Sequence, residues 1–303
     1  MCGGSRDHST GLELNWPWPV MLRHTRSMGV AVSSGPAILS RKLRYRAPYD
    51  WESFLSFVRP RAIPGLEEVD SDSYSRLGVK VRRAAKGDCL MAHLDLHSRD
   101  SLQRTLEQAG RFFDLRANTA EIGAALMKSR LLRPIVKRHP GLRVPGCWDG
   151  FELAVRALLG QQVTVKGATT LAGRLVSRFG APRAEILAEA DLAPIGLPKA
   201  RAAAICGFAR AVCEGRIRFD DPLSSGVSSA QMIGRMCELP GIGPWTANYI
   251  AMRAMGDPDA FPASDLGLLK AAGIASARRL EEVAESWRPW RAYAAMYLWR
   301  TLG

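Results

Sequence analysis

The sequence predicts an α+β N-terminal domain followed by a mainly α-helical region. Strand-like and helical segments alternate between residues 41 and 119, whereas helical periodicity dominates from Ala120 onward. Short links that contain Gly or Pro separate the later helical segments, as in an all-α bundle. The chain has 303 residues, 47% of them hydrophobic, which is enough for two or three domains with their own cores.

Residues 1–40 differ in composition from the rest of the chain. They mix Gly, Ser, His, Arg and two tryptophans without sustained periodicity, and they lack a clean signal-peptide core. We expect a disordered extension over these residues. A translation start at Met28 is an equally plain explanation of their composition.

The α+β domain is expected over residues 41–119. Strand-like runs cover Gly78–Arg83 and Cys89–Leu96, and helical runs cover Tyr49–Arg59 and Ser101–Phe113. This order predicts an antiparallel sheet covered by helices.

The following region should be built almost entirely of helices. Helices are expected at Ala120–Met127, Trp148–Leu159, Val165–Phe179, Ala184–Ala190, Pro198–Glu214, Ala230–Glu238, Trp245–Ala254, Asp265–Ala271 and Ser276–Leu302.

A glycine-rich turn, Leu239 to Ala247 (LPGIGPWTA), is the most informative stretch of the chain. Gly241 and Gly243 can adopt positive φ and allow close approach of a backbone, and a proline before them stiffens the entry. The helix that follows would offer the amide groups of Gly241, Gly243 and Thr246 to an anion such as DNA phosphate. A tight turn between two helices, without any ligand, is the alternative.

An acidic residue, Asp265, follows Thr246 by nineteen positions and begins the next helical segment. It could simply cap that helix. A helix N-terminus also keeps a carboxylate ionised, and an ionised carboxylate can stabilise a developing cation. The two roles are compatible.

The charge balance favours a polyanionic partner. Lys plus Arg number 42 and Asp plus Glu 29, which gives a net charge of +13. Such a surplus strengthens binding to nucleic acid through counterion release. A basic protein with no nucleic-acid function would show the same balance.

The six cysteines form no C-x-x-C pair, which is typical of a reduced, cytoplasmic protein. No apolar run approaches the roughly 18 residues that a membrane span requires. We therefore expect no membrane partner.

The turn resembles the hairpin of the helix-hairpin-helix DNA glycosylases. Asn248-Tyr249 and Phe261–Lys270 resemble the 3-methyladenine DNA glycosylase II (AlkA-type) branch. The similarity extends over Tyr45–Trp51, Leu142–Cys147, Ala157–Val163 and Trp287–Trp290. It implies a helical domain over residues 150–256 that contains the hairpin, and a second one from residues 120–149 and 257–303. It also implies a monomeric enzyme of the bacterial nucleoid.

The resemblance assigns roles to individual residues. Asp265 takes the place of the catalytic aspartate. The base pocket would be lined by Phe57, Gln161, Trp245, Tyr249 and Trp299. For each aromatic residue, plain core packing is the alternative, most of all for Phe57.

Three further expectations follow from the same resemblance. Gln162 would wedge into the DNA where the family's best-known pattern has leucine. Trp245 stands where strand-cutting relatives have a lysine nucleophile, and tryptophan cannot form a Schiff base. Ser264, Leu266 and Arg300 also depart from the pattern, and these departures bear on substrate range.

We expect no redox or organic cofactor. No cysteine follows Cys237, so the iron-sulfur cluster of some relatives has no ligands here. The resemblance leaves room for a monovalent cation on the carbonyls of Cys237 and Leu239.

The sequence therefore predicts a monofunctional DNA glycosylase that removes alkylated purines, 3-methyladenine and 7-methylguanine, from double-stranded DNA. A glycosylase for oxidised or deaminated bases is one alternative. A helix-hairpin-helix module that binds DNA without cutting it is another.

Overall fold

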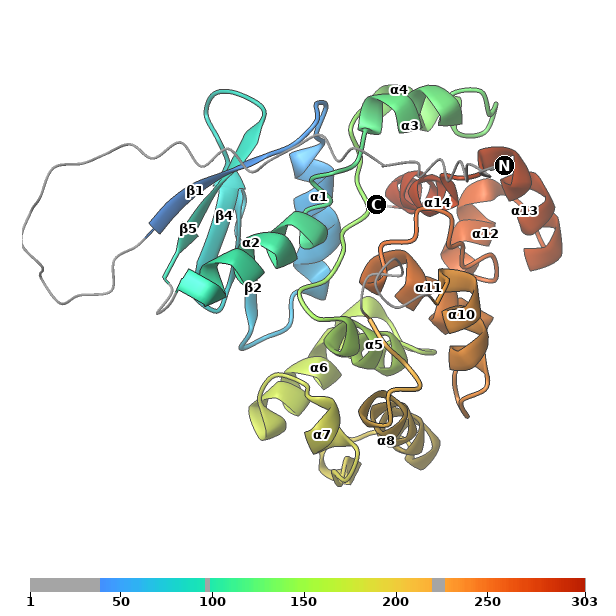
Figure 1. Ribbon diagram of the computed structural model, residues 1–303. Helices are drawn as coiled ribbons and strands as arrows, with labels where there is room; N and C mark the ends of the chain where they lie inside the picture. The colour runs from blue at the N-terminus through green and yellow to red at the C-terminus, as the bar shows by residue number, and fades with distance from the viewer. Residues whose placement is uncertain (1–38, 96–98, 220–226, 303) are drawn as a thin grey trace, which may run out of the picture. The chain divides into compact units, whose positions relative to one another are not determined.

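The structure is a computed structural model, and it describes residues 39–95, 99–219 and 227–302. These residues belong to one compact unit, Pro36–Gly303. The expected extension over residues 1–40 lies almost wholly outside the described residues. In Figure 1 the sheet lies on one side of this unit and most of the helices lie on the other.

The N-terminal part contains a five-stranded antiparallel sheet of order β1-β5-β4-β3-β2. The strands are β1 (Leu39–Arg44), β2 (Glu67–Val69), β3 (Ser73–Arg76), β4 (Val79–Arg83) and β5 (Cys89–Leu94). A two-residue turn joins β3 to β4, and both of its residues, Leu77 and Gly78, have positive φ. Such a turn matches the right-handed twist of the strands on either side of it.

The sequence predicted β4 and β5, but the other three strands were missed. In β1, exposed polar or charged residues alternate with partly or fully buried ones, and β2 has three residues. Neither strand has the apolar run by which short strands are usually found.

Two helices pack on one face of the sheet: α1 (Trp51–Val58) and α2 (Arg99–Phe112) (Figure 1). Asp50 caps α1 by accepting a hydrogen bond from the Ser53 amide at 3.0 Å. The core between helices and sheet is largely aromatic; for example, the rings of Trp51 and Phe54 stack with centroids 5.6 Å apart. A 3-10 helix, η1 (Arg59–Arg61), leads from α1 toward the rest of the chain.

The remainder is helical, as the sequence predicted. Its helices are α3 (Thr119–Leu126), α4 (Arg133–Arg138), α5 (Gly150–Leu159), α6 (Val165–Phe179), α7 (Ala184–Leu187), η2 (Ala193–Ile195), α8 (Lys199–Cys213), α10 (Ser229–Cys237), α11 (Pro244–Ala254), α12 (Leu266–Ala272), α13 (Ala277–Ala284), η3 (Glu285–Trp287), α14 (Arg291–Trp299) and η4 (Arg300–Leu302).

These helices enclose two hydrophobic cores. One is built mainly from α5 to α11, and Ile63 and Leu66 join it from the loop before β2. The other combines α3 and α4 with residues from α11 to α14. Because α11 contributes to both cores, it lies between them, and it is the helix that follows the glycine-rich turn.

The prediction of a single helix over Ser276–Leu302 is wrong. The structure breaks it into α13, η3, α14 and η4, and Arg288 is extended with φ −58° and ψ 143°. Pro289 is the cause, because proline has no amide hydrogen and disfavours helical geometry in the residue before it.

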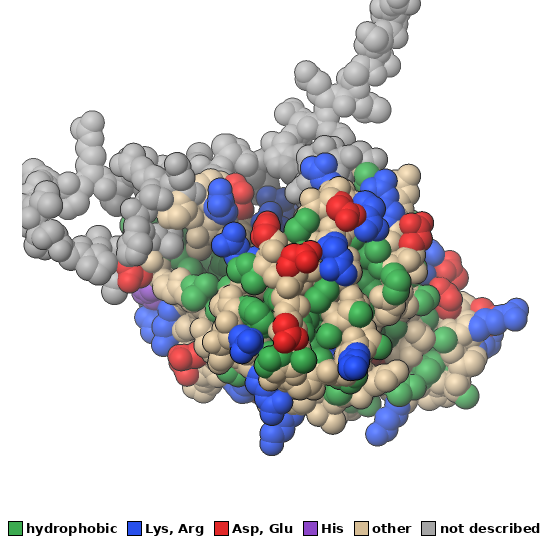
Figure 2. All heavy atoms as spheres, turned by 90° about the horizontal axis from the view of Figure 1, so that it is seen from below, with side chains coloured by type: hydrophobic (Ala, Val, Ile, Leu, Met, Phe, Trp, Pro, Cys, Tyr) green, Lys and Arg blue, Asp and Glu red, His purple; other side chains and the backbone are tan. Residues whose placement is uncertain are grey.

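Within the described ranges, none of the helices has both the length and the apolar character needed to cross a membrane. Figure 2 shows one face of the molecule, where Lys and Arg side chains are interspersed with acidic side chains and apolar surface. The basic surplus is therefore not gathered into a single patch on this face.

Candidate active site at Asp265

The glycine-rich turn joins α10 to α11 as a helical hairpin. Ser228 and Gln231 form a capping box that begins α10. Gly241 has φ +86°, and a Cβ atom there would lie 2.7 Å from the Cβ of Ala204 on α8. Both the conformation and the contact with α8 require glycine at position 241.

The second glycine behaves differently from the first. Gly243 is extended, with φ −92° and ψ 173°, and it forms the N-cap of α11 just before Pro244. Of the two glycines that can adopt positive φ, only Gly241 does so. Both glycines are exposed, and no atom lies within 4 Å of the Cβ position of Gly243. The turn therefore has room for a ligand that approaches the N-terminus of α11.

Gln161 holds the hairpin in place. Its Nε2 donates to the Gly241 carbonyl at 2.9 Å and to Thr246 Oγ1 at 3.0 Å. The backbone carbonyl of Gln161 accepts from Arg201 Nη2 at 2.6 Å. These bonds connect the end of α5 to the hairpin and to α8. Thr246 is buried as a whole residue, and its side chain is engaged in this contact.

The next residue, Gln162, has an unusual backbone conformation. It is exposed and has φ +56°, in the left-handed region that residues other than glycine rarely adopt. Such strain is often found at functional sites. Val163 and Val165 beside it are each 39% exposed, so apolar surface adjoins the expected wedge.

Asp265 is the N-cap of α12, as the capping alternative predicted. Its Oδ1 accepts from the Leu268 amide at 2.9 Å. The same oxygen accepts from the indole NH of Trp299 at 2.9 Å, and Oδ2 accepts from the indole NH of Trp245 at 2.8 Å. The carboxylate is partly exposed. Three donors thus fix the orientation of this carboxylate.

The four aromatic residues that the resemblance assigns to the base pocket meet around this carboxylate. The Trp245 and Tyr249 rings stack at 5.5 Å, Tyr249 meets Trp299 edge-on at 6.2 Å, and Phe57 stacks on Trp299 at 6.3 Å. They come from α1, α11 and α14, and all four are only partly buried. The structure therefore brings together Phe57, Trp245, Tyr249, Trp299 and Asp265, while Gln161 lies at the neighbouring hairpin.

Two arginines pack behind these rings. The Arg61 guanidinium lies 3.9 Å from the centre of the Phe57 ring, and Arg253 lies 5.2 Å from the same centre. Arg253 also donates to the Tyr249 hydroxyl at 2.7 Å. Burial raises the pKa of Tyr249, but the positive charges of Arg253 and Arg61 outweigh it and lower that pKa below its usual value.

Gly267 gives the carboxylate its space. A Cβ atom at this position would lie 2.9 Å from Asp265 Oδ1, 3.1 Å from Leu302 and 3.5 Å from Trp299. Leu266 beside it is 81% exposed, although apolar side chains are usually buried. Gly267 and Leu266 thus border the acid on the α12 side.

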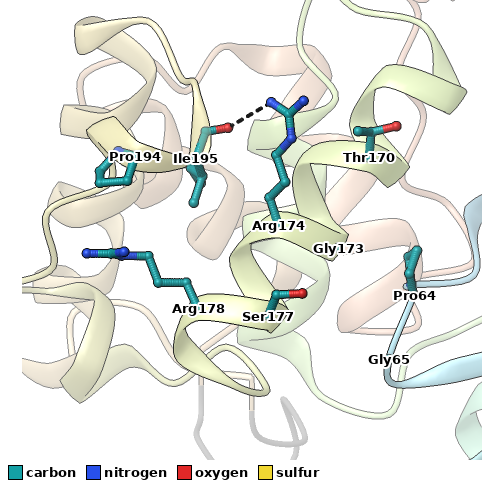
Figure 3. A pocket seen from close by; sticks show the side chains of 9 residues that line it. All are labelled: Pro64, Gly65, Thr170, Gly173, Arg174, Ser177, Arg178, Pro194 and Ile195. Carbon is teal, nitrogen blue, oxygen red and sulfur yellow. Dashed lines mark hydrogen bonds between the residues drawn. The ribbon is translucent and has the colours of Figure 1, made fainter.

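A hollow of about 780 Å³ is lined by a different set of residues from those around Asp265 (Figure 3). Its lining includes Arg174 and Arg178 on α6, and Arg174 Nη1 donates to the Ile195 carbonyl at 3.3 Å. It is wide open to solvent and is not lined by any of the expected site residues. We therefore place the site at Asp265, where a fixed carboxylate and aromatic rings converge.

Comparison with known proteins agrees with this geometry. Residues 40–149 match the AlkA N-terminal domain, and residues 155–292 match the HhH-GPD superfamily base excision DNA repair protein model. The chain is 33% identical over 283 residues to DNA-3-methyladenine glycosylase 2 of Escherichia coli (strain K12), covering 86% of this chain and 97% of that one. The chain belongs to the HhH-GPD superfamily.

Other HhH-GPD relatives extend the comparison. The "Probable bifunctional transcriptional activator/DNA repair enzyme AlkA" of Mycobacterium tuberculosis is 37% identical over 296 residues, or 90% of this chain. This chain covers only 59% of that relative's length. Among solved structures, the 3-methyladenine DNA glycosylase from Archaeoglobus fulgidus has the same fold, with a TM-score of 0.71 and 21% identity over 86% of this chain and 97% of that one.

Sequence analysis of this HhH-GPD protein missed Arg61, Arg253 and Gly267. Arg253 follows Tyr249 by four positions, so helical spacing alone could have paired them. Arg61 follows Phe57 by the same four positions. Gly267 gave no such indication, because its role depends on a missing Cβ atom.

Proposed function

We propose that this protein is a monofunctional DNA glycosylase that hydrolyses the N-glycosidic bond of alkylated purines in double-stranded DNA. The observation that supports it best is the Asp265 carboxylate, held by the indoles of Trp245 and Trp299 beside stacked aromatic rings. DNA-3-methyladenine glycosylase is also what the Escherichia coli relative is named.

The proposed reaction uses Asp265 for charge stabilisation. As the bond between C1′ and the base nitrogen breaks, its electron pair leaves with the base and positive charge develops on the sugar. A fixed carboxylate nearby stabilises that oxocarbenium character. Water then adds to C1′ and releases a proton, which leaves a free base and an abasic site.

The aromatic rings suit a purine. A flat base can stack on Trp245, Tyr249 or Trp299, and alkylation at N3 or N7 makes the purine cationic, which adds cation-π attraction. The positive charge also makes the base a good leaving group, so little general acid catalysis is required.

The base has to leave the duplex before it can reach Asp265. We propose that the hairpin amides of Gly241, Gly243 and Thr246 bind the DNA backbone at the exposed N-terminus of α11. Gln162 projects from its strained position to fill the space that the base vacates. A monovalent cation on the carbonyls of Cys237 and Leu239 would strengthen the grip on phosphate.

The absence of strand cleavage follows from Trp245. In relatives that cut DNA, a lysine at this position forms a Schiff base with the sugar, whereas an indole cannot. Here the indole instead binds Asp265 Oδ2. Water is therefore the acceptor in the proposed reaction.

The deciding experiment measures release of 3-methyladenine and 7-methylguanine from methylated duplex DNA by the wild type and by Asp265→Asn. Asparagine keeps the helix cap, so the variant should fold and bind DNA while excision falls by about 10²-fold or more. Tight binding by the wild type without release of any base would instead support the non-catalytic DNA-binding module. Release of oxidised or deaminated bases alone would instead support a glycosylase for those lesions.

A second assay tests the monofunctional mechanism. The products are separated without heat or alkali, and a parallel reaction contains borohydride. We expect intact strands with abasic sites and no trapped adduct. Strand breaks or a covalent adduct would refute the monofunctional mechanism.

A further inference from the structure

A small cavity of about 40 Å³ is lined in part by Arg61 and Arg253, the two arginines that pack on the Phe57 ring. Its lining includes three arginines from different elements: Arg61 of η1, Arg156 of α5 and Arg253 of α11. About 10–15 Å³ is enough to hold one water molecule, so this space could hold about three waters or one monatomic ion.

The hydrogen-bond partners found for these arginines are all neutral. Arg61 donates to the Phe57 carbonyl, and Arg156 Nη2 donates to Thr169 Oγ1 at 3.0 Å. Arg253 donates to the carbonyls of Pro145 and Gly146 and to the Tyr249 hydroxyl. Within the part of the chain that the structure describes, none of the three forms an ion pair, and the buried Nη1 of Arg156 has no hydrogen-bond partner.

Two carboxylates, Glu67 and Glu152, also line the cavity, but both are engaged elsewhere. The Glu152 carboxylate accepts hydrogen bonds from both Nη atoms of Arg76, at 3.0 and 2.7 Å. Glu67 accepts from the Tyr74 hydroxyl and the Ile63 amide, and Arg76 lies 3.6 Å away. With Arg76 included, four guanidinium groups therefore surround two carboxylates, which leaves a local surplus of two positive charges.

Burying unpaired positive charge is costly, and the pKa of Arg156 reflects that cost. The pKa of Arg156 is lowered to about 10. Burial is the largest cause and repulsion by Arg253 and Arg61 adds to it, while Tyr249 and Glu67 oppose the change. A small anion in the cavity would relieve this repulsion and give Arg156 Nη1 a partner.

We propose that this cavity is a binding site for a monatomic anion of the halide class. The anion sits behind the wall of the base pocket, where Arg61 and Arg253 face the Phe57 and Tyr249 rings. Positive charge behind an aromatic ring opposes the binding of a cation on its other face. An anion in the cavity therefore favours a cationic purine in the pocket, and this consequence rests on the proposed function.

The site is tested first by crystallography of the intact protein in sodium bromide, with anomalous diffraction at the bromine absorption edge. We expect a bromide peak within hydrogen-bonding distance of Arg156 Nη1. Density there without anomalous signal would mean that the cavity holds water, and this result would overturn the proposal.

Thermal unfolding of the DNA-free protein gives a second test, at constant ionic strength with bromide or gluconate as the anion. Wild type should melt about 3 °C higher in bromide once bromide exceeds its Kd roughly tenfold. Arg156→Met should lose that difference, and the control Arg174→Met, on the next helix (α6) and outside the cavity lining, should keep it. If Arg156→Met fails to fold, the bromide peak in the wild type decides the matter.

Base release then separates this proposal from the proposed function. Excision of 7-methylguanine should be several-fold faster in bromide than in gluconate at equal ionic strength. No excision in either salt, with a bromide peak present, would refute the proposed function and leave the anion site standing. Equal excision in both salts without a bromide peak would refute the anion site and leave the glycosylase standing.

Discussion

The indole NH of Trp245 lies 2.8 Å from Oδ2 of Asp265, and within the described ranges it is the hydrogen-bond donor found for that oxygen. The other oxygen has two donors, the Trp299 indole and the Leu268 amide. The two oxygens of the proposed catalytic carboxylate are therefore held unequally, and this asymmetry can be tested.

Trp245→Phe should slow single-turnover excision about tenfold, because it frees Oδ2 while leaving a ring to stack on Tyr249. A hydrogen bond to a charged group contributes about 1.5–3 kcal/mol, and partial exposure lets water replace some of it. Trp299→Phe is the matched control and should have a smaller effect, since Oδ1 keeps the Leu268 amide. Equal effects of the two changes would argue against this account.

Gly267→Ala should impair excision. The added methyl group would lie 2.9 Å from Asp265 Oδ1, and three hydrogen bonds prevent that carboxylate from moving aside freely. Gly207→Ala on α8 is the control, because no atom lies within 4 Å of its Cβ position. It should stabilise the protein by about 0.5–1 kcal/mol and leave the rate unchanged. An unchanged rate in Gly267→Ala would show that the space is not needed.

Gln162→Ala should reduce excision from duplex DNA at least tenfold while excision of the same lesion from single-stranded DNA stays the same. The wedge is required only when a stacked and paired base has to be displaced. Val165→Ala, an exposed apolar residue three positions on, is the comparison variant. A parallel loss on single-stranded DNA would place Gln162 in the pocket rather than in the duplex.

Asp114 should make the protein less stable as pH rises. Burial raises the pKa of its carboxyl to about 7, against the lowering effects of Arg143 and of hydrogen bonds from Tyr293 and Val144. Between about pH 4 and pH 7 the folded state therefore holds a proton that the unfolded state has lost. The stability that this proton provides is complete below pH 4 and is lost as pH rises through 7.

Urea unfolding at pH 5 and pH 7.5 provides the measurement for Asp114. Between pH 5 and pH 7.5 the free energy of unfolding of the wild type should fall by about 2–4 kcal/mol more than that of Asp114→Asn, because asparagine does not ionise. An equal change of stability with pH in both proteins would contradict the raised pKa.

Local pattern predicted the parts of the site that lie close together in sequence. The hairpin, the helix cap at Asp265 and the stacked pair Trp245 and Tyr249 all follow from spacing along one or two helices. By contrast, Phe57 and Trp299 are 242 positions apart, and family resemblance rather than spacing assigned them to one pocket.

The missed features share a physical cause. β1 and β2 are short or charged strands whose pairing with neighbours, rather than their own composition, defines them. Gln161 was expected at the pocket edge, and its bonds to Gly241 and Thr246 depend on tertiary packing across 80 or more positions. The break at Pro289 was present in the sequence, since proline excludes a continuous helix there.

Two of the four rings around Asp265 lie outside the helical hairpin that is proposed to hold DNA. The hairpin belongs to α10 and α11, whereas Phe57 comes from α1 beside the sheet and Trp299 from α14. A shift of α1 or a change at Phe57 would therefore resize the proposed base pocket without disturbing the hairpin. An architecture of this kind allows the choice of lesion to evolve, or to be engineered, independently of the ability to hold a duplex.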